Sequence, residues 1–352
     1  MKIVNVPVRG KDYKVTIGRG AISALAETIA SMNADAVCIA ADTNTVRFAP
    51  QVRGIISGIS VYESVIVPGE EHKTPETVID LCRSFARYGL TRQSVILALG
   101  GGVTGDAAGF AASCYMRGIR CVQIPTTLIA MTDSSVGGKT GVDLPEGKNL
   151  FGAFHQPDAV IAELSFLDTL PEREIRAGLG EMLKYYGIGA FPHSALDVFP
   201  LTGDSMRSGA FENVASDCVA YKARAVAEDE FDTGVRRYLN LGHSFGHALE
   251  KLCGFKTYNH GEAVAVGTVI ALRAGVRLGV TAPEALDAVL TAASKMGLDV
   301  ASGVDPAALL PHMLSDKKNS RGVIRLVILK QIGEPLIYEI TESELRAVLE
   351  DL

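Results

Sequence analysis

The stretch Val95-Ile-Leu-Ala-Leu-Gly100-Gly-Gly-Val-Thr-Gly105-Asp106 decides the fold that we expect. Residues 95–99 form an apolar run typical of a buried strand, and residues 106–115 have the composition of a helix. The turn between them, residues 100–105, fits the pattern G-x-G-x-x-G. Glycines let the backbone approach a pyrophosphate there, and the helix N-terminus favours its negative charge. The stretch therefore predicts an α/β domain with a nucleotide site at the end of this strand.

One feature departs from the usual dinucleotide fingerprint. That fingerprint follows the first strand and has an acid about twenty residues later, whereas this one follows a middle strand and residues 118–128 hold no Asp or Glu. Asp42, at the end of an earlier strand, could bind the ribose instead. A glycine turn with a purely conformational role is the alternative.

Outward from this turn, apolar runs alternate with helical stretches through the N-terminal half. A hairpin is predicted first, from 2–7 and 13–17, and the following apolar runs are 36–41, 61–67, 94–99, 120–124 and 159–164, with helices near 45–56 and 75–88. Near-continuous apolar strands interleaved with helices are typical of a parallel sheet covered on both faces.

The pattern changes at Pro171, where a proline can begin a new helix. Helical spacing then continues over 171–188, 212–229, 240–252, 261–279 and 282–296. We therefore expect an α/β Rossmann-like domain over 1–170 and an all-helical domain over 171–352. Two β-like runs, 323–329 and 335–340, stand apart from that helical pattern and precede a final helix.

Composition narrows the function classes. The 352 residues are 47% hydrophobic and 21% charged, and 34 Lys and Arg against 40 Asp and Glu give a net charge of −6. Such a chain has no bulk attraction for nucleic acid or an anionic membrane, so we expect neither as a partner. Its longest apolar runs are too short to span a bilayer. The six cysteines contain no Cys-x-x-Cys pair, and the N-terminal residues lack a signal-peptide pattern, so we expect reduced thiols and a cytoplasmic location.

Histidines cluster in the helical half. His243 and His247 are four residues apart and would share one helix face, and His260 follows at the expected start of the next helix. Glu181 could complete a metal site, with Lys184 on the same face of its own helix. The alternative is that these are hydrogen-bonded core histidines.

Cations recur within apolar or glycine-rich segments. They are Arg117, Lys139, Lys148, Lys184, Lys222, Arg236, Lys317 and Lys318. Most such residues belong to solvated surface, but Lys139 and Lys148 bracket a glycine-rich loop that is poor in other charge, as expected if both bind one anion. The loop falls short of a phosphate-binding loop of the kinase type, because Asp133 stands where that motif requires glycine.

Several stretches together resemble the 3-dehydroquinate synthase family, within the sugar-phosphate cyclases. They are Gly69-Glu-Glu-His-Lys-Thr, residues 100–113, the long run 125–157, Gly180-Glu-Met-Leu-Lys-Tyr, residues 240–250, His260-Gly-Glu-Ala-Val and Asp316-Lys-Lys. They occur in the family's order between about residues 69 and 330, and the run 125–157 is the most specific of them.

The resemblance implies an active site in a cleft between a dinucleotide-binding domain and a helical domain, with NAD, a divalent metal such as zinc or cobalt, and a homodimeric assembly. It implies the conversion of 3-deoxy-D-arabino-heptulosonate 7-phosphate into 3-dehydroquinate and phosphate, a step of the shikimate pathway. The family's reaction proceeds by transient oxidation with NAD, phosphate elimination, re-reduction, ring opening and aldol closure. NAD is thus regenerated in each turnover, unlike in an ordinary dehydrogenase.

Carried onto matching positions, the resemblance assigns roles residue by residue. The implied metal ligands are Glu181, His243 and His260, which leaves His247 near the reacting group. The implied substrate pocket is Arg117, Asp133, Lys139, Lys148, Asn149, Lys184, Lys222, Arg236, Asn240, His247 and one of Lys317 and Lys318, of which Lys139, Lys184, Arg236, Asn240 and His247 are the expected catalytic residues. The implied cofactor residues are Asp42, Glu70, Lys73, Gly101, Gly102, Val103, Asp106, Thr126, Thr127, Lys139, Lys148, Phe166, Thr169, Leu170 and Glu174.

Two other enzyme classes compete with this interpretation. Another sugar-phosphate cyclase, making a deoxy-inosose or a valiolone, would share the fold, but the run from Asp133 to Gly141 fits the dehydroquinate branch better. A metal-dependent glycerol-type dehydrogenase would normally have an aspartate where Glu181 stands and would lack the Lys139 and Lys148 loop. A non-catalytic scaffold is disfavoured because every expected ligand is present.

Overall fold

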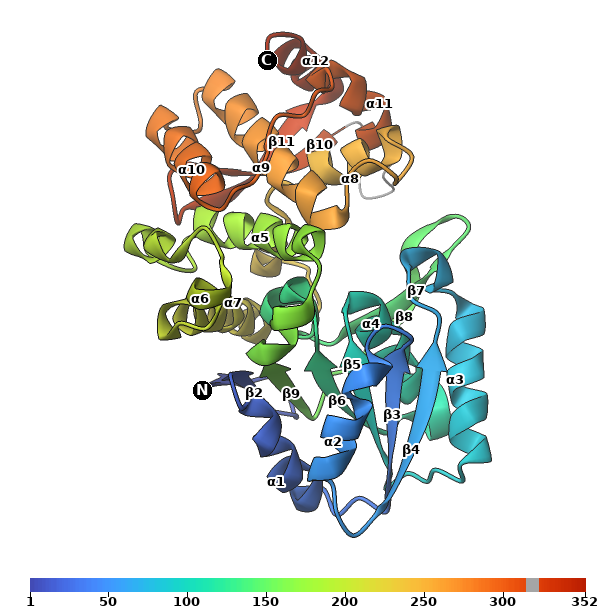
Figure 1. Ribbon diagram of the computed structural model, residues 1–352. Helices are drawn as coiled ribbons and strands as arrows, with labels where there is room; N and C mark the ends of the chain where they lie inside the picture. The colour runs from blue at the N-terminus through green and yellow to red at the C-terminus, as the bar shows by residue number, and fades with distance from the viewer. Residues whose placement is uncertain (315–322) are drawn as a thin grey trace. The chain divides into compact units, whose positions relative to one another are not determined.

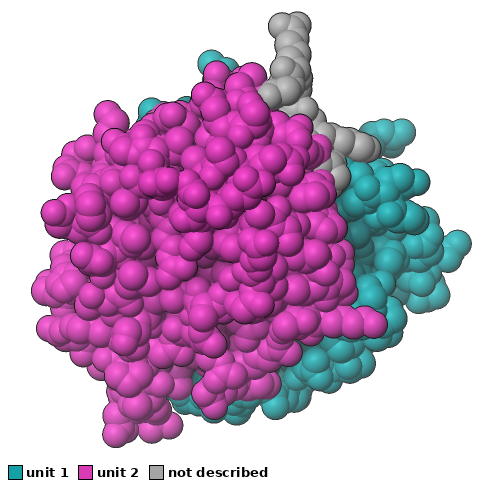
Figure 2. Space-filling view, turned by 90° about the horizontal axis from the view of Figure 1, so that it is seen from above, with its two compact units in different colours: residues 1–170, 219–231 teal, residues 171–218, 232–352 magenta. Residues whose placement is uncertain are grey.

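The computed structural model describes residues 1–314 and 323–352, so the predicted substrate residues Lys317 and Lys318 lie outside the described residues. The chain forms two compact units, distinguished by colour in Figure 2. Unit 1 comprises Met1–Leu170 and Val219–Phe231, and unit 2 comprises Pro171–Cys218 and Asp232–Leu352. Residues 219–231, which the sequence pattern groups with the second half, are thus counted with the first unit.

A seven-stranded sheet forms the centre of unit 1 (Figure 1). Its order is β1 (Lys2–Val6), β2 (Tyr13–Gly18), β9 (Ala159–Glu163), β6 (Arg120–Pro125), β5 (Val95–Gly100), β3 (Ala36–Asp42) and β4 (Ser60–Ile66). Only the β1–β2 pair is antiparallel, and every other neighbouring pair is parallel. The predicted parallel α/β domain with its N-terminal hairpin is confirmed.

Helices cover this sheet, as the buried strands require. The helices of unit 1 are α1 (Ala24–Ser31), α2 (Ala49–Ile55), α3 (Pro75–Arg87) and α4 (Gly102–Cys114), with the short helical turns η1 (Ala21–Ser23), η2 (Val46–Phe48), η3 (Glu70–His72), η4 (Tyr115–Arg117) and η6 (Leu164–Thr169). Alternate strand residues such as Cys38, Ala40, Ile96 and Ala98 pack in one core cluster with Phe85 and Phe110 of α3 and α4. Period-two alternation thus assigns one face of the sheet to these two helices.

The segment with Lys139 and Lys148 is a β-hairpin, which corrects the expected loop. A π-helical turn, η5 (Ala130–Ser134), leads into β7 (Lys139–Leu144), which pairs antiparallel with β8 (Gly147–Phe154). Thr140 pairs with Ala153 and Gly141 with Gly152. Strand spacing places Lys139 and Lys148 about 13 Å apart along the hairpin.

Unit 2 is mainly helical. It contains α5 (Glu172–Gly187), η7 (His193–Val198), α6 (Gly203–Met206), part of α7 (Gly209–Glu228), η8 (Val235–Asn240), α8 (His243–Leu252), α9 (His260–Arg277), α10 (Pro283–Lys295), η9 (Pro306–Leu309), α11 (Leu310–Leu314) and α12 (Glu342–Glu350). It also contains the antiparallel strands β10 (Val323–Leu329) and β11 (Pro335–Thr341). The predicted helical domain is confirmed, and the two β-like runs expected near its end form this strand pair, so the domain is mainly and not entirely helical. Ile324, Leu326 and Ile328 have apolar side chains that complete a core with α8, α9 and α12.

The sheet order places the glycine turn where α/β proteins bind ligands. The chain passes from β3 to β4 in one direction along the sheet and from β5 to β6 in the other, so the topological switch lies between β3 and β5. Asp42 is the last residue of β3 and Gly101 follows the last residue of β5, so both lie at the C-terminal ends of these parallel strands. Among the described residues no helix is long and apolar enough to span a membrane.

Candidate functional site

A carboxylate and two imidazoles converge in unit 2 from three different helices. Glu181 lies in α5, His243 is the first residue of α8, and His260 is the first residue of α9. Each offers a ligand atom, and these atoms all lie within 4.8 Å of one another. The sequence explains where α9 begins, because Asn259 and Glu262 form a capping box around His260.

Both imidazoles face the same oxygen of the Glu181 carboxylate. Nε2 of His260 lies 3.3 Å and Nε2 of His243 lies 3.6 Å from Oε1 of Glu181. The other carboxylate oxygen, Oε2, accepts a 2.5 Å hydrogen bond from Nζ of Lys184. One carboxylate thus holds a buried ammonium with one oxygen and faces two imidazole nitrogens with the other.

The second nitrogen of each imidazole is directed at an acceptor. Nδ1 of His243 lies 3.2 Å from the carbonyl oxygen of Leu241, to which it can donate. Nδ1 of His260 lies 3.6 Å from Oε2 of Glu250, a residue only 3% exposed. Both rings therefore present Nε2 to Glu181, the arrangement in which a metal-binding histidine is fixed by an outer carboxylate or carbonyl.

Sequence reasoning missed Glu250, although a signal existed. It lies three residues after His247 in the same helix, and a carboxylate in so apolar a stretch needs a partner. A second group of potential ligands, His247, Glu250 and His260, overlaps the first through His260. The rings of His247 and His260 stack with centroids 5.7 Å apart. His243 and His247 do adjoin, at 5.5 Å, but the structure also brings in Glu181 and His260, which helix spacing alone could not reveal.

The charges in this cluster are strongly coupled. Burial opposes ionisation of Glu181, but Lys184, His243 and His260 together hold its pKa well below the usual range. Burial, aided by Lys184, lowers the pKa of His243 to about 3. Burial also opposes a charge on His260, yet Glu181 and Glu250 outweigh it and raise the pKa of His260 to about 10. The two carboxylates beside His260 thus favour positive charge at this position.

The other predicted residues of unit 2 differ in exposure. Arg236 is 2% exposed and Lys184 is 1% exposed, so both cations belong to the interior, and Asn240 is partly buried. Arg236 and Asn240 belong to η8, the turn that precedes the helix of His243 and His247. Glu174, expected at the cofactor, is exposed in the first turn of α5.

In unit 1 the glycine turn has the local geometry that a phosphate group requires. Gly101 is the N-cap of α4, the first helical turn contains no acidic residue, and Gly102 and Val103 begin the helix. A Cβ atom on Gly101 would lie 2.9 Å from Thr127, another expected cofactor residue. Gly105 packs against β6, where its carbonyl oxygen accepts a 3.1 Å bond from Gln123. The three glycine positions therefore combine an open helix N-terminus with close packing of helix on strand.

Asp42 is held in place by its own surroundings. Oδ1 accepts hydrogen bonds from the backbone of Asn44 and Thr45, and Oδ2 accepts one of 2.9 Å from Thr104. The carboxylate thus ties the end of β3 to α4 across the switch point. Any contact with a ribose would have to share these oxygens.

Lys73 forms a buried junction between expected cofactor and substrate residues. Its Nζ lies 2.7 Å from Oδ2 of Asp106 and 2.6 Å from Oδ1 of Asn149. Burial raises the pKa of Asp106 despite Lys73, whereas Asp106 and Glu70 outweigh burial and raise the pKa of Lys73. This lysine therefore joins the turn after β4 to α4 and to the β7–β8 hairpin.

Two more predicted substrate residues meet in unit 1. Lys222, from the C-terminal half of α7, forms an ion pair with Asp133 and donates a 2.8 Å hydrogen bond to its backbone carbonyl. Asp133 belongs to the π-helical turn that leads to Lys139. The sequence placed these residues in different halves of the chain, and the structure brings them together.

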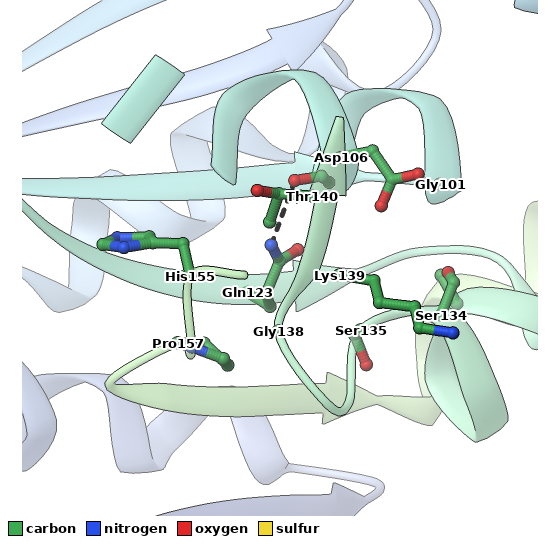
Figure 3. Close-up of a pocket in the computed structure, with 12 residues that line it drawn as sticks. Gly101, Asp106, Gln123, Ser134, Ser135, Gly138, Lys139, Thr140, His155 and Pro157 are labelled. Atoms are coloured by element: carbon green, nitrogen blue, oxygen red, sulfur yellow. Dashed lines mark hydrogen bonds between the residues drawn. The ribbon is translucent and has the colours of Figure 1, made fainter. Parts of the chain in front are cut away.

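A narrow pocket adjoins the glycine turn (Figure 3). Gly101, the N-cap of α4, and Asp106 of α4 line it with Lys139 of β7, and Lys139 extends along the side occupied by Ser134 and Ser135. The hydroxyls of Ser135 and of Thr126, an expected cofactor residue, are buried without a protein partner. Ser134 and Ser135 were not among the predicted site residues, although they lie in the run 125–157.

The remaining predicted residues of unit 1 are spread around it. Arg117 is exposed in η4 with φ +67°, and it lines a different pocket together with Lys11 and Arg92. Phe166 is buried, and Thr169 is exposed and accepts a 2.8 Å hydrogen bond from Arg47. Lys148 and Leu170 form no part of the pocket beside Lys139.

Two solved structures share this fold over nearly the whole chain. A 2-deoxy-scyllo-inosose synthase complexed with carbaglucose-6-phosphate, NAD⁺ and Co²⁺ superposes with a TM-score of 0.88 at 24% identity, covering 99% of this chain and 100% of the other. A 2-epi-5-epi-valiolone synthase from Streptomyces hygroscopicus subsp. jinggangensis 5008, with NAD⁺ and Zn²⁺ bound, gives 0.84 at 27% identity and 97% coverage of both chains. The fold is thus that of synthases which hold a nucleotide and a divalent metal.

Sequence comparison narrows this class. The family model described as 3-dehydroquinate synthase N-terminal matches residues 63–177, and the one described as 3-dehydroquinate synthase C-terminal matches residues 178–319. A 3-dehydroquinate synthase of Xanthomonas campestris pv. campestris (strain 8004) is 41% identical over 357 residues, covering 96% of this chain and 95% of the relative. The chain belongs to the 3-dehydroquinate synthase family.

Proposed function

We propose that this chain catalyses the 3-dehydroquinate synthase reaction, the conversion of 3-deoxy-D-arabino-heptulosonate 7-phosphate into 3-dehydroquinate and phosphate. The enzyme class is that of the carbon–oxygen lyases acting on phosphates. The observation that carries the proposal is the convergence of Glu181, His243 and His260 in a chain of this family.

The donor set of that cluster fits zinc or cobalt. One carboxylate oxygen and two imidazole nitrogens are ligands that both metals accept, and three protein ligands leave a position for substrate, as in catalytic zinc sites. Glu250 and the Leu241 carbonyl would orient the two imidazoles, as outer partners of metal-bound histidines do. Glu181, His243 and His260 are accordingly the proposed metal ligands, and His247 beside them is proposed to contact substrate.

The glycine turn of unit 1 fits NAD. Gly101, Gly102 and Val103 offer backbone groups at a helix N-terminus, the chemistry suited to a pyrophosphate. The buried hydroxyls of Thr126 and Ser135 have no protein partner and suit a polar ligand. When bound, NAD supplies a reversible hydride acceptor and the metal supplies a Lewis acid for a substrate hydroxyl.

The chain's own cations account for the choice of substrate. The substrate carries a phosphate and a carboxylate, so fixed ammonium and guanidinium groups must neutralise both. Lys184 and Arg236 are almost fully buried, and Lys222 is held by Asp133. Burial and pairing keep such groups in fixed orientations, which favours the binding of anionic groups at defined positions. The remaining cofactor and substrate residues named above are proposed on the family's motifs.

A phosphate-release assay tests this function. The purified protein, supplied with NAD and zinc or cobalt, is expected to release inorganic phosphate from 3-deoxy-D-arabino-heptulosonate 7-phosphate and not from glucose 6-phosphate. The fold similarity to a deoxy-inosose synthase complexed with carbaglucose-6-phosphate makes this hexose phosphate the relevant comparison. Release from glucose 6-phosphate alone would assign the chain to another cyclase, and steady NADH formation would indicate a dehydrogenase.

We also propose that the protein is a cytoplasmic homodimer. All six cysteines are free thiols, which suits a reducing compartment. Unit 1 exposes Leu150, Phe151, Phe154 and Phe231, each at 44% or more, and the last two pack with ring centroids 5.2 Å apart. An exposed apolar group of this kind favours a protein contact. Sedimentation is expected to give twice the monomer mass, and Phe154→Lys with Phe231→Lys should lower it; a monomeric parent protein would contradict the proposal.

A further inference from the structure

Each proposed metal ligand has a glycine as its immediate neighbour in the chain. Gly180 precedes Glu181, Gly242 precedes His243, and Gly261 follows His260. All three glycines are buried, and they lie where the helices of the cluster contact one another. This pattern raises the question of whether they are simply packing residues or determine the position of the ligands.

The contact between α5 and α9 is backbone against backbone. A Cβ atom on Gly180 would lie 2.0 Å from the carbonyl oxygen of Gly261. A Cβ atom on Gly261 would lie 1.8 Å from the carbonyl oxygen of Ala177. Real Cβ atoms essentially never come closer than 3.0 Å to another atom. Because both obstacles are backbone atoms of a helix, no rotamer change can relieve either clash.

The contact between α8 and α9 follows the same principle. A Cβ atom on Gly267 of α9 would lie 2.2 Å from the carbonyl oxygen of Gly242. Gly242 has φ +80°, a conformation that L side chains rarely adopt, and its own Cβ atom would lie 2.7 Å from the carbonyl oxygen of Val264. The residue before His243 is therefore fixed by both its backbone conformation and its contact with α9.

We propose that Gly180, Gly242 and Gly261 are positioning residues of the metal site. They let the backbones of α5, α8 and α9 approach closely enough for one carboxylate and two imidazoles to converge on one position. The inference rests on the proposed metal ligands and adds the reason that three separate helices can supply them. Metal sites tolerate errors of only about 0.2 Å in ligand distance, so a change in helix separation should affect metal binding before it affects the fold.

The size of the expected change follows from the contacts. With alanine at position 261, the distance from its Cβ atom to the Ala177 carbonyl oxygen must increase from 1.8 Å to at least 3.0 Å. This displacement moves His260 relative to Glu181. With alanine at position 242, the new Cβ atom would meet the Thr268 hydroxyl at 2.3 Å, but its backbone contacts, with the Thr268 nitrogen and the Val264 carbonyl oxygen, need to open only from 2.7 Å. Gly275 is a matched control in the same helix, because its Cβ atom would meet the Thr281 hydroxyl at 2.0 Å. It lies about 22 Å from His260 along the helix axis.

The experiment compares Gly261→Ala, Gly242→Ala and Gly275→Ala in the full chain, with Co²⁺ as the probe. Affinity is measured by calorimetry, ligand geometry by the visible Co²⁺ spectrum, and folding by the melting temperature of the metal-free protein. We expect Gly261→Ala to weaken Co²⁺ binding by about 10- to 100-fold and to alter the spectrum. Gly242→Ala should have a smaller effect and Gly275→Ala none, even where its melting temperature falls as far.

Two results would overturn the proposal. One is a Co²⁺ affinity that follows the loss of melting temperature equally in all three variants, which would indicate a general packing role. The other is an unchanged affinity and spectrum in Gly261→Ala, or in Gly242→Ala if the first variant does not fold. Glu181→Gln separates this failure from that of the site itself: if it retains Co²⁺ binding the ligand assignment is wrong, and if it loses binding only the role of the glycines is in question.

Discussion

Replacing Glu181 by glutamine should remove metal binding and, by a separate effect, destabilise the metal-free protein. The side chain is 2% exposed, and glutamine keeps its size while removing its charge. Oε1 faces His243 and His260, so the substitution removes the anionic member of the ligand group. Oε2 holds Lys184 at 2.5 Å, so the same substitution also breaks a buried ion pair.

The two effects have different magnitudes. A unit charge about 4 Å from another, at an effective dielectric constant of about 20, contributes about 4 kcal/mol. Since about 1.4 kcal/mol corresponds to a tenfold change, metal affinity should fall roughly a thousandfold. Breaking a buried ion pair costs about 3 to 5 kcal/mol, so the metal-free variant should unfold at a clearly lower urea concentration.

A second variant separates these effects. Glu181→Gln with Lys184→Met removes the buried ammonium as well, so we expect stability to recover while metal binding stays absent. Glu163→Gln is a matched control, because Glu163 is 1% exposed and accepts three backbone hydrogen bonds in unit 1. It should lose stability and keep its metal. Calorimetry with Zn²⁺ and urea unfolding measure both quantities, and metal affinity within tenfold of the parent in Glu181→Gln would refute the reasoning.

Four further predictions follow from other parts of the molecule. His247→Ala should retain the metal and lose catalytic rate, whereas His260→Ala should lose the metal, as metal content after dialysis would show. Loss of metal in His247→Ala with retention in His260→Ala would instead assign the metal to His243 and His247. Gly101→Ala should weaken NAD binding at least tenfold without changing Zn²⁺ affinity, as calorimetry with each ligand would show. Equal losses of both affinities would contradict the assignment of NAD to the glycine turn and of the metal to a separate cluster. Burial, together with nearby Lys11, lowers the pKa of His155 below 6.5. As the pH falls below about 6.5, the imidazole is therefore protonated in the unfolded chain but stays neutral in the folded one. The free energy of unfolding is thus highest above about pH 6.5 and decreases as the pH decreases. Urea unfolding of His155→Gln should show a shallower decline over this range, and an identical slope would count against it. Burial raises the pKa of Cys121 to about 12 while Cys114 is exposed, so iodoacetamide should label Cys114 in the native protein and reach Cys121 only after unfolding, as peptide mass spectrometry would reveal.

Local chemistry made much of unit 1 predictable. The apolar run that became β5 and the glycines that follow it need only short-range rules, although α4 begins at Gly102 and not at the expected Asp106. The β7–β8 hairpin escaped prediction because its residues do not alternate between apolar and polar. Its pairing depends on Gly152, where a Cβ atom would lie 2.2 Å from the Thr140 carbonyl oxygen of the opposite strand. That contact exists only once the strands have met.

The metal group shows a different limit of the sequence. Spacing along one helix favours His243 with His247, and nothing local connects Glu181 with residues some sixty or eighty positions later. The family resemblance supplied that connection. Glu250 and the glycine contacts of α5, α8 and α9 emerge only from helix packing, because they depend on which backbones approach one another.

The central claim is that the chain uses NAD catalytically to eliminate phosphate from 3-deoxy-D-arabino-heptulosonate 7-phosphate. The most direct measurement follows phosphate, 3-dehydroquinate and NADH together in one reaction with limiting NAD and added Zn²⁺. We predict equal amounts of phosphate and 3-dehydroquinate, many turnovers for each NAD, and no accumulation of NADH. NADH rising in step with substrate consumption, or phosphate released without 3-dehydroquinate, would contradict the account.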